Sequence, residues 1–499
     1  MSRRLTVFAI VIVLLFVAVA VQAMNVQFFR ASALDASPLN PRNSSTSSQF
    51  PRGQIVAADG TVLAESVPTA GFYRYRRVYP LGSLTSGVVG FAGPSYIWGL
   101  EAQYSNVLSP HAQPAQSLAQ VLAPTSAADS LNLTLEPALQ RIARSGLAGR
   151  DGAVVAINPQ TGAVLAMYSN PNYNPTPLTS PNYQVAKAAW LAINTKDAHG
   201  LPPLGLVATQ QTFPPGSTFK IVTTSAVLLG KPQLWFKKYP SVPFIHLPQS
   251  NVLLHNFGNV PCGGDVQEML PPSCDPGYAS LGLDLGGDVL ATTANAFGFN
   301  TTPPLDLPGV VASYFPPAAS FLTNLPGVAY SAIGQQNVRE SALQNAMVAA
   351  AIANGGTIMT PHLMDYVTGP DGTVVSRYKD SVWKQPLSGA QAARIVPLMQ
   401  DVARFGTAAG WFLAADEVGA KTGTAQTSLT ATNTSTDDWM IAFAPASHPE
   451  VAVAVVVPFQ AVSGTGAAIA GPIMKCVIEG ALALAAGLPA TGTSTTCPA

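Results

Sequence analysis

Charged side chains are scarce in this chain. Lys, Arg, Asp and Glu make up 10% of the 499 residues, and 25 basic side chains balance 25 acidic ones. Globular domains usually carry about a quarter charged residues. A formal net charge of zero, without any basic cluster, argues against nucleic acid as a partner. The six histidines show no metal-ligand spacing, so we expect neither a metal nor a cofactor.

Cysteines are also few, but they indicate the redox environment of the chain. Four cysteines fit an oxidising environment. Cys262 and Cys274 bracket a short loop rich in Gly and Pro, and we expect them to form a disulfide. Cys476 and Cys497 either pair or stay free, because the sequence alone cannot fix connectivity.

Only one apolar run is long enough to cross a membrane. Residues 5–24 carry no charge, and as a helix they would span the roughly 30 Å hydrocarbon core of a bilayer. Arg3 and Arg4 precede this run, which predicts a cytoplasmic N-terminus and an extracytoplasmic remainder. A cleaved signal peptide, cut after Val21-Gln22-Ala23, is the alternative. Its apolar region would exceed the usual length of about 7–15 residues, so we favour an uncleaved single-pass anchor.

Proline and glycine are plentiful, at 43 and 42 residues, and indicate a loop-rich globular chain. We expect four parts: an anchor at 1–24, a small membrane-proximal domain at 25–148, a large domain at 149–486 and a flexible tail at 487–499. The first residues of the second part, 25–50, are polar and suit a stalk. Asp59-Gly60 between two apolar runs predicts a hairpin, and residues 51–130 are typical of a mostly β domain with little helix.

Apolar runs predict strands at both ends of the large domain. We expect strands at 152–158 and 163–169, and again at 418–427, 439–445 and 451–459. Helical spacing predicts helices at 134–147, 217–229, 341–353, 391–402 and 473–485, with a kink or break near Pro397. Strands that bracket a helical middle suggest one antiparallel sheet, whose first strands and last hairpin join across the sequence. The predicted fold class is therefore α+β.

A serine and a lysine three residues apart give the first chemical signal. Pro214, Pro215 and Gly216 cannot continue a helix backwards, so a helix should begin at or just before Ser217. Lys220 would then share a helix face with Ser217, whose hydroxyl would lie near unpaired N–H groups. Such a serine could be a nucleophile with the lysine amine as its base. The spacing alone is weak evidence, because first-turn serines usually cap their helices.

Two further motifs follow in order. Ser273-Cys274-Asp275 precedes an apolar helix, and Lys421-Thr422-Gly423-Thr424 lies on the strand predicted at 418–427. The order Ser-x-x-Lys, Ser-x-Asn, Lys-Thr-Gly is that of penicillin-binding proteins and class A β-lactamases. The chain resembles the class B, monofunctional penicillin-binding transpeptidases, in particular the actinobacterial branch named penicillin-binding protein A. The likeness runs over nearly the whole length and includes the blocks at 52–55, 152–159, 331–335 and 353–356.

The resemblance implies both architecture and activity. It implies a transpeptidase domain, similar to the serine β-lactamases, with a central antiparallel sheet covered by helices on both faces, and a small, mostly β pedestal domain. The activity implied is that of a D,D-transpeptidase that crosslinks peptidoglycan stem peptides ending in D-Ala-D-Ala and is acylated by β-lactams. The partners implied are the cytoplasmic membrane and a SEDS-type glycosyltransferase or other division or elongation proteins.

The resemblance also assigns roles to the motif residues. Ser217 would attack the substrate carbonyl, Lys220 would act as base beside Lys421, and Ser273 would relay a proton to the leaving amine. The Thr422 and Thr424 hydroxyls would hold the substrate carboxylate in the field of Lys421. Backbone N–H groups of Ser217 and Thr424 would form an oxyanion hole. Gly423 would allow a substrate backbone to approach closely.

Two departures from the family pattern keep a second interpretation open. Asp275 stands where the family has Asn. An ionised carboxylate only accepts hydrogen bonds, and it would bind Lys220 and raise the lysine pKa, although Asp275 and Pro276 also suit the start of a helix. The segment 206–208 reads Leu-Val-Ala where relatives commonly carry Asn-Arg-Ala. The alternative is a catalytically weakened penicillin-binding scaffold of the wall-synthesis machinery.

Overall fold

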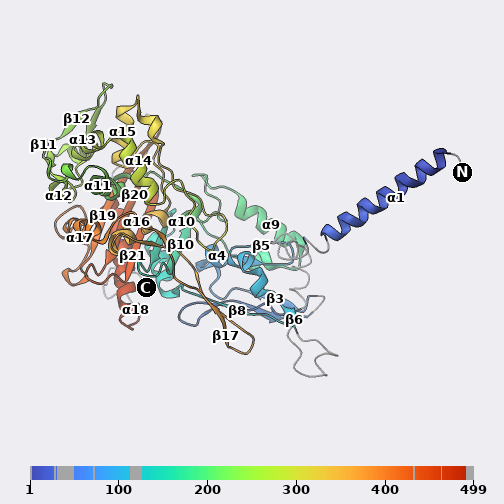
Figure 1. The fold of residues 1–499 in the computed structure, drawn as a ribbon. Helices are drawn as coiled ribbons and strands as arrows, with labels where there is room; N and C mark the ends of the chain where they lie inside the picture. Colours follow the sequence, from blue (N-terminus) through green and yellow to red (C-terminus); the bar gives the residue numbers. More distant parts are fainter. Residues whose placement is uncertain are drawn as a thin grey trace.

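The computed structural model describes residues 3–26, 30, 50–70, 73–112, 126–430, 433–461 and 464–490. Its centre is a five-stranded antiparallel sheet in the order β10-β9-β21-β20-β19 (Figure 1). The bounds are β9 Gly152–Ile157, β10 Val164–Asn170, β19 Gly419–Thr430, β20 Asn433–Ala444 and β21 Val451–Ala461. The first two strands of the large domain therefore pair with the last three, as predicted. β21 pairs directly with β9, and this contact joins segments about 300 residues apart in the chain.

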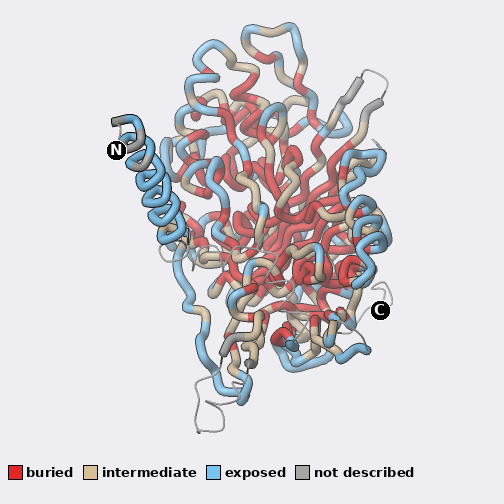
Figure 2. The backbone as a smooth tube through the Cα atoms, turned by 90° about the vertical axis from the view of Figure 1, so that its right-hand side faces the viewer, coloured by how far each residue is buried: buried red, intermediate tan, exposed pale blue. Residues whose placement is uncertain are grey.

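Helices cover both faces of this sheet. All residues of β9 and the first eight of β21 are buried, which requires cover on each side. α8 (Pro137–Leu147) and α18 (Gly466–Ala485) pack together, with α18 against β20 and β21, while α16 (Ala342–Ala353) packs on β9, β20 and β21. Figure 2 shows the resulting band of buried chain through the middle of the molecule. The helix-covered antiparallel sheet predicted from the sequence is confirmed.

Several helix bounds differ from the predictions. α8 begins at Pro137 instead of 134, because proline suits the first helical position and Ser130–Leu133 form strand β8. α17 (Gly389–Arg404) continues through Pro397 without a break, and α18 begins at Gly466, before Pro472. The start of α16 follows the prediction, since the Ser341 hydroxyl accepts the Gln344 N–H.

The long middle region holds more helix than the sequence suggested. Its helices form a lobe around α11 (Lys220–Gly230) and α13 (Asp275–Leu285). Further α-helices within the described residues are α4 Ser86–Val89, α5 Leu100–Gln103, α6 Ser105–Leu108, α9 Tyr183–Asn194, α10 Val207–Gln210, α12 Val266–Met269, α14 Gly287–Ala296 and α15 Leu325–Ala332. Two-stranded pairs fill the connections: β4 Phe91–Ala92 with β5 Ile97–Trp98, β6 His111–Ala112 with β7 Ser126–Ala127, β11 Tyr239–Val242 with β14 Cys262–Gly264, β12 Phe244–His246 with β13 Leu253–His255, and β15 Ile358–Met359 with β18 Val382–Lys384.

A second sheet of six strands lies in the N-terminal part, in the order β17-β16-β8-β1-β2-β3. Its bounds are β1 Ile55–Val56, β2 Val62–Pro68, β3 Tyr75–Val78, β8 Ser130–Leu133, β16 Met364–Thr368 and β17 Val374–Arg377. The hairpin predicted at Asp59-Gly60 is present between β1 and β2. The hairpin β16–β17 comes from the second half of the chain and pairs with β8. The N-terminal sheet therefore includes a segment from beyond the domain boundary that we predict near residue 148.

Two helices are long and apolar, but their surroundings differ. α18 is long and apolar enough to span a membrane, yet half of its apolar window is buried and it packs on β20 and β21. It is a core helix. α1 (Arg3–Met24) has exposed apolar side chains, with Phe16 74% exposed. Figure 2 shows this helix coloured mostly as exposed. Most of the predicted stalk at 25–50 and residues 491–499 of the predicted tail lie outside the described residues.

Candidate active site

Ser217 lies in a tight turn just ahead of α11. Residues Gly216–Phe219 form a 3-10 turn, η4, and the α-helix proper begins at Lys220. The helix thus starts later than the sequence suggested. In 3-10 geometry residues i and i+3 lie on the same side of the turn, so the serine and lysine still face one direction. Ser217 is half-buried, whereas Lys220 is fully buried.

Contacts from distant segments hold this turn in place. The Gly216 N–H donates to the Gly334 carbonyl at 2.9 Å, and the indole Nε1 of Trp439 donates to the Pro214 carbonyl at 2.9 Å. On α16, Asn345 donates to the Thr218 hydroxyl at 3.0 Å. Sequence reasoning missed Asn345 and Trp439. Neither belongs to a motif, and each reaches the turn only through the folded chain.

The Lys220 amine is surrounded by acceptors. Its Nζ donates to Asp275 Oδ1 at 2.6 Å, to the Ser273 carbonyl at 2.7 Å and to Ser273 Oγ at 3.2 Å. The Tyr278 ring centroid is 5.4 Å away. Three acceptors use all three N–H groups of an ammonium ion. Within the described residues no hydrogen bond joins Lys220 to the Ser217 hydroxyl.

Ser273 bridges the two motif lysines. Lys421 Nζ donates to Ser273 Oγ at 2.8 Å and to the Thr422 carbonyl at 2.9 Å. Ser273 has a positive φ of 60°, which is uncommon for a residue other than glycine. The loop around it is fixed by the predicted disulfide between Cys262 and Cys274, with a Cα–Cα distance of 5.6 Å.

The remaining two cysteines were left open by the sequence. Cys476, on α18, is also disulfide-bonded. Cys497 lies outside the described residues. The interpretation that Cys476 remains a free thiol is therefore wrong.

Asp275 faces the site and does not cap its helix. It is the first residue of α13, and Cys274 occupies the N-cap position without a side-chain cap. The Asp275 side chain is 24% exposed, and its carboxylate pairs with Lys220. The backbone N–H of Asp275 donates to Asn256 Oδ1 at 3.2 Å. The departure from asparagine therefore places a negative charge next to the buried amine.

Burial lowers the pKa of both lysines. For Lys220, burial lowers the pKa and the Asp275 carboxylate opposes it. For Lys421, burial and then the charge of Lys220 hold the pKa well below its usual range, again against Asp275. Two buried amines thus share one carboxylate, which favours a state with at least one amine neutral.

The strand β19 runs beside the serine turn. A Cβ at Gly216 would lie 3.1 Å from the carbonyl carbon and oxygen of Thr424. At Gly423 a Cβ would lie 2.6 Å from the Pro215 carbonyl oxygen. The close approach at Gly423 is therefore made by the chain's own turn, whereas the sequence led us to expect a substrate backbone there. The absence of a side chain lets the strand and turn pack together.

The two threonines of this strand have different partners. Thr422 Oγ1 is 2.6 Å from Thr407 Oγ1. Thr424 Oγ1 accepts the Gly466 N–H at 2.9 Å, and Asp438 is the cross-strand neighbour of Thr424 in the β19–β20 register. The Thr424 hydroxyl thus accepts one hydrogen bond from the start of α18.

Two buried aspartates stand opposite this part of β19. Asp438 pairs with Thr424 and Asp437 with Ala425 in the β19–β20 register. Burial raises the pKa of Asp437 to about 7, against Arg339 and a hydrogen bond from the Phe459 N–H. Burial likewise raises the pKa of Asp438 to about 6. Both carboxyls therefore titrate near neutral pH.

The structure also gathers one histidine with two carboxylates. The ligand atoms of Asp151, Asp197 and His199 lie within 4.8 Å of one another. His199 Nδ1 pairs with Asp151 at 2.6 Å, and Asp197 Oδ1 accepts two backbone N–H groups. These contacts account for the cluster without an ion. That the protein uses no metal stays a prediction.

The chain is similar to characterised proteins over almost its full length. Residues 152–479 match the family model of the penicillin binding protein transpeptidase domain, and residues 52–128 match that of the penicillin binding protein A dimerisation domain. The peptidoglycan D,D-transpeptidase PbpA of Mycolicibacterium smegmatis is 36% identical over 97% of this chain and 99% of its own. PbpA of Mycobacterium tuberculosis is 34% identical over 97% and 99%.

Solved structures agree with these similarities. The ceftriaxone acyl-enzyme complex of penicillin-binding protein A from M. tuberculosis aligns with a TM-score of 0.79 and 32% identity, covering 89% of this chain and all of that one. Its penicillin G acyl-enzyme complex aligns with a TM-score of 0.77 and 34% identity, covering 86% and 99%. The matched transpeptidase region begins at β9 and ends within α18, so it contains all three sequence motifs of the site.

The buried aspartates predict how stability depends on pH. A carboxyl whose folded pKa lies near 7 stays protonated in the folded state, while the unfolded chain ionises above about 4. Folding then takes up a proton, so stability falls as the pH rises from about 4 to about 7. Asp437→Asn should make the free energy of unfolding depend less on pH. The difference over this range is at most a few kcal/mol, since one pKa unit corresponds to about 1.4 kcal/mol.

Melting temperatures at several values between pH 4 and 8 test this expectation. Asp437→Asn should gain stability relative to the wild type as the pH rises. Asp380→Asn, which alters an exposed aspartate, is the matched control and should keep the wild-type slope. Identical slopes for wild type and Asp437→Asn would contradict the assignment.

Proposed function

This chain belongs to the penicillin-binding transpeptidases, and on that premise we propose that it is a serine-type peptidoglycan D,D-transpeptidase inhibited by β-lactams. Its relatives are named peptidoglycan D,D-transpeptidases, and similar structures hold β-lactam acyl-enzymes. The observation that carries the proposal is the convergence of Ser217, Lys220, Ser273 and Lys421 from three distant segments beside the open strand β19.

In the proposed reaction Ser217 Oγ attacks the carbonyl of the penultimate D-Ala of a stem peptide. The peptide C–N bond breaks, the terminal D-Ala leaves as an amine that takes up a proton, and an acyl-enzyme remains. An amine from a neighbouring strand then attacks this ester, forms the crosslink and releases Ser217. A β-lactam would acylate the same hydroxyl by opening its ring amide.

Lys220 is the base in this proposal, and its surroundings decide when it can act. A serine hydroxyl needs an adjacent base to become a good nucleophile. Lys220 must first lose a proton and one of its three hydrogen-bond partners to accept the Ser217 proton. Burial favours the neutral amine of Lys220, whereas Asp275 favours its ammonium form. Lys220 in turn lowers the pKa of Lys421. A general base of this kind typically contributes about 10²–10⁴-fold to the rate.

Ser273 suits the role of proton relay. Its oxygen accepts hydrogen bonds from both lysines, at 3.2 and 2.8 Å. A hydroxyl has two acceptor lone pairs and one donor. With both lone pairs used, the Ser273 proton is the part of the group left to donate toward the leaving amine.

The rest of the machinery is proposed from the strand β19 and the serine turn. Backbone N–H groups of Ser217 and Thr424 would stabilise the oxyanion, and removal of one such donor costs about 2.7–4 kcal/mol. Lys421 and the Thr422 hydroxyl would hold the substrate carboxylate. The Thr424 hydroxyl, which accepts the Gly466 N–H, would donate to the same carboxylate. Gly423 allows the strand to lie against the serine turn.

A catalytically weakened scaffold of the wall-synthesis machinery is the second candidate. The 2.6 Å ion pair between Asp275 and Lys220 favours it, because the carboxylate favours the ammonium form of the proposed base and opposes the effect of burial. The segment around α10 offers no compensation, since Leu206, Val207 and Ala208 are buried and apolar. Acylation kinetics distinguish a slow enzyme from a non-enzyme.

We also propose that α1 anchors the protein as a single-pass membrane helix, with the transpeptidase domain extracytoplasmic. The exposed apolar surface of α1 supports this, because water does not favour a bare helix of this kind. An enzyme held at the membrane would meet a SEDS-type glycosyltransferase, or another division or elongation protein, through that span.

The first prediction concerns the nucleophile. Ser217→Ala should abolish covalent labelling by a fluorescent penicillin, because no other hydroxyl occupies its place. Gel fluorescence measures the label. Ser280→Ala, which removes a hydroxyl bonded to the Pro276 carbonyl on α13, should label like the wild type. Retained labelling of Ser217→Ala would rule out this nucleophile.

The second prediction concerns Asp275. Asp275→Asn removes the charge that holds Lys220 protonated, so the lysine pKa should fall and acylation near pH 7 should be kept or increased. The increase should reach about tenfold for each pKa unit lost, and the pH–rate profile should move to lower pH. Asp284→Asn is the control. It also alters an aspartate of α13, and it breaks the ion pair between Asp284 and Lys237. Complete loss of acylation in Asp275→Asn would show that the carboxylate is required.

The third prediction concerns the anchor. The full chain should stay in membranes after carbonate extraction and keep its N-terminal residues, whereas deletion of residues 1–24 should release it. Photocrosslinking from the exposed Phe16 in cells should capture a SEDS-type polymerase or another wall-synthesis membrane protein. An N-terminus at Met24 in the mature protein would indicate a cleaved signal peptide instead.

A further inference from the structure

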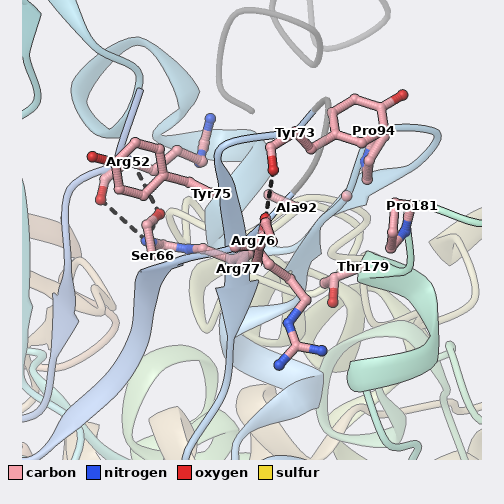
Figure 3. Close-up of a pocket in the computed structure, with 13 residues that line it drawn as sticks. Arg52, Ser66, Tyr73, Tyr75, Arg76, Arg77, Ala92, Pro94, Thr179 and Pro181 are labelled. Carbon is pink, nitrogen blue, oxygen red and sulfur yellow. Dashed lines mark hydrogen bonds between the residues drawn. The ribbon is translucent and has the colours of Figure 1, made fainter. Parts of the chain in front are cut away.

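A pocket of about 410 Å³ lies beside β3, the edge strand of the N-terminal sheet, and none of its lining residues belongs to the transpeptidase motifs. Figure 3 shows the residues that line it. One wall is the β2–β3 hairpin, and the other includes the residues after β4 and the segment that follows β10. Its lining residues are Arg52, Ser66, Thr69, Ala70, Tyr73, Tyr75, Arg76, Arg77, Ala92, Gly93, Pro94, Thr179 and Pro181. Volumes of roughly 300–1,000 Å³ are usual for small-molecule sites.

Positive charge predominates in this wall. Arg52 and Arg77 share a single buried carboxylate, that of Glu101 on α5, at 3.1 and 2.5 Å. Neighbouring residues of a strand point to opposite faces. Arg76 therefore points away from the buried Arg77, and it is exposed. Three guanidinium groups against one carboxylate leave an excess of positive charge at the pocket.

One buried donor of this network lacks an acceptor. Arg52 is fully engaged, with bonds to Glu101 and to the Ser109 hydroxyl. Arg77 donates through Nε to Glu101 and only weakly through Nη1, at 3.3 and 3.4 Å. Its Nη2 is buried and has no acceptor within the described part of the chain. A buried unpaired donor is costly, and an anionic oxygen is the partner that a guanidinium binds best.

The remaining walls suit a flat group. Tyr73, Tyr75, Pro94 and Pro181 line the pocket with aromatic and proline rings. We propose that this pocket binds an oxyanion, a carboxylate or a phosphate, carried on a flat ring. The anion pairs with the exposed Arg76, in the positive field of the buried Arg52 and Arg77, and the ring lies among the tyrosines and prolines. Because Thr179 and Pro181 belong to the matched transpeptidase region, a bound ligand connects it to the N-terminal sheet.

Calorimetric titration of the full chain in detergent tests the proposal. The probes are phenyl phosphate and benzoate, with benzyl alcohol as the neutral ring and inorganic phosphate as the anion without a ring. Ionic strength is held constant, because salt screens exposed charges. The protein is first acylated with penicillin, so that the transpeptidase site, itself expected to bind carboxylates, is blocked. At least one ring-bearing anion should bind saturably and more tightly than benzyl alcohol and inorganic phosphate.

Two arginine variants locate the binding. Arg76→Ala should weaken the anion at least about tenfold, whereas Arg74→Ala, which removes an exposed arginine beside the pocket, should leave the affinity unchanged. Both variants should be acylated by penicillin at the wild-type rate, which shows that they are folded. Stronger binding of phenyl phosphate than of benzoate assigns the phosphate, and the reverse assigns the carboxylate. No saturable anion binding, or equal losses in both variants, would overturn the proposal.

Discussion

Two lysine amines buried around one serine hydroxyl are the constraint on which the site depends. Removal of an ammonium ion from water costs several kcal/mol. Lys220 pairs with the carboxylate of Asp275, whose charge also acts on Lys421. The fold therefore favours loss of a proton from this pair. That tendency is what a serine nucleophile requires of its base. The Asp275 carboxylate acts against it, so the balance between burial and this one charge sets how much neutral amine is present.

Rigid neighbours keep these groups together. The Ser273 loop is tied by the Cys262–Cys274 disulfide. The serine turn is held from Gly334, Asn345 and Trp439, which lie on three other segments. Such support fixes side-chain geometry before a substrate arrives, and preorganised groups need no rearrangement during the reaction.

The two sheets of the molecule are not independent in the chain. The β16–β17 hairpin leaves the transpeptidase region and completes the N-terminal sheet by pairing with β8. The arginine pocket lies on the same sheet. Thr179 and Pro181, which follow β10 in the chain, also line it. The N-terminal part is thus joined to the transpeptidase part by backbone pairing and by shared side chains.

The sequence by itself determined the chemistry and most of the framework. Three short motifs carried the serine, the lysines and the edge strand, continuous apolar runs predicted the five-stranded sheet, and a short loop predicted the Cys262–Cys274 bridge. Only the tertiary structure decided between the two interpretations of Asp275, in favour of the contact with Lys220. It alone showed that Thr424 accepts the Gly466 N–H and that a hairpin from residues 364–377 joins the first sheet. The physical reason is the separation in sequence between the residues that interact. Periodicity and capping act between near neighbours, whereas these contacts join residues tens to hundreds of positions apart, which leave no local pattern to read.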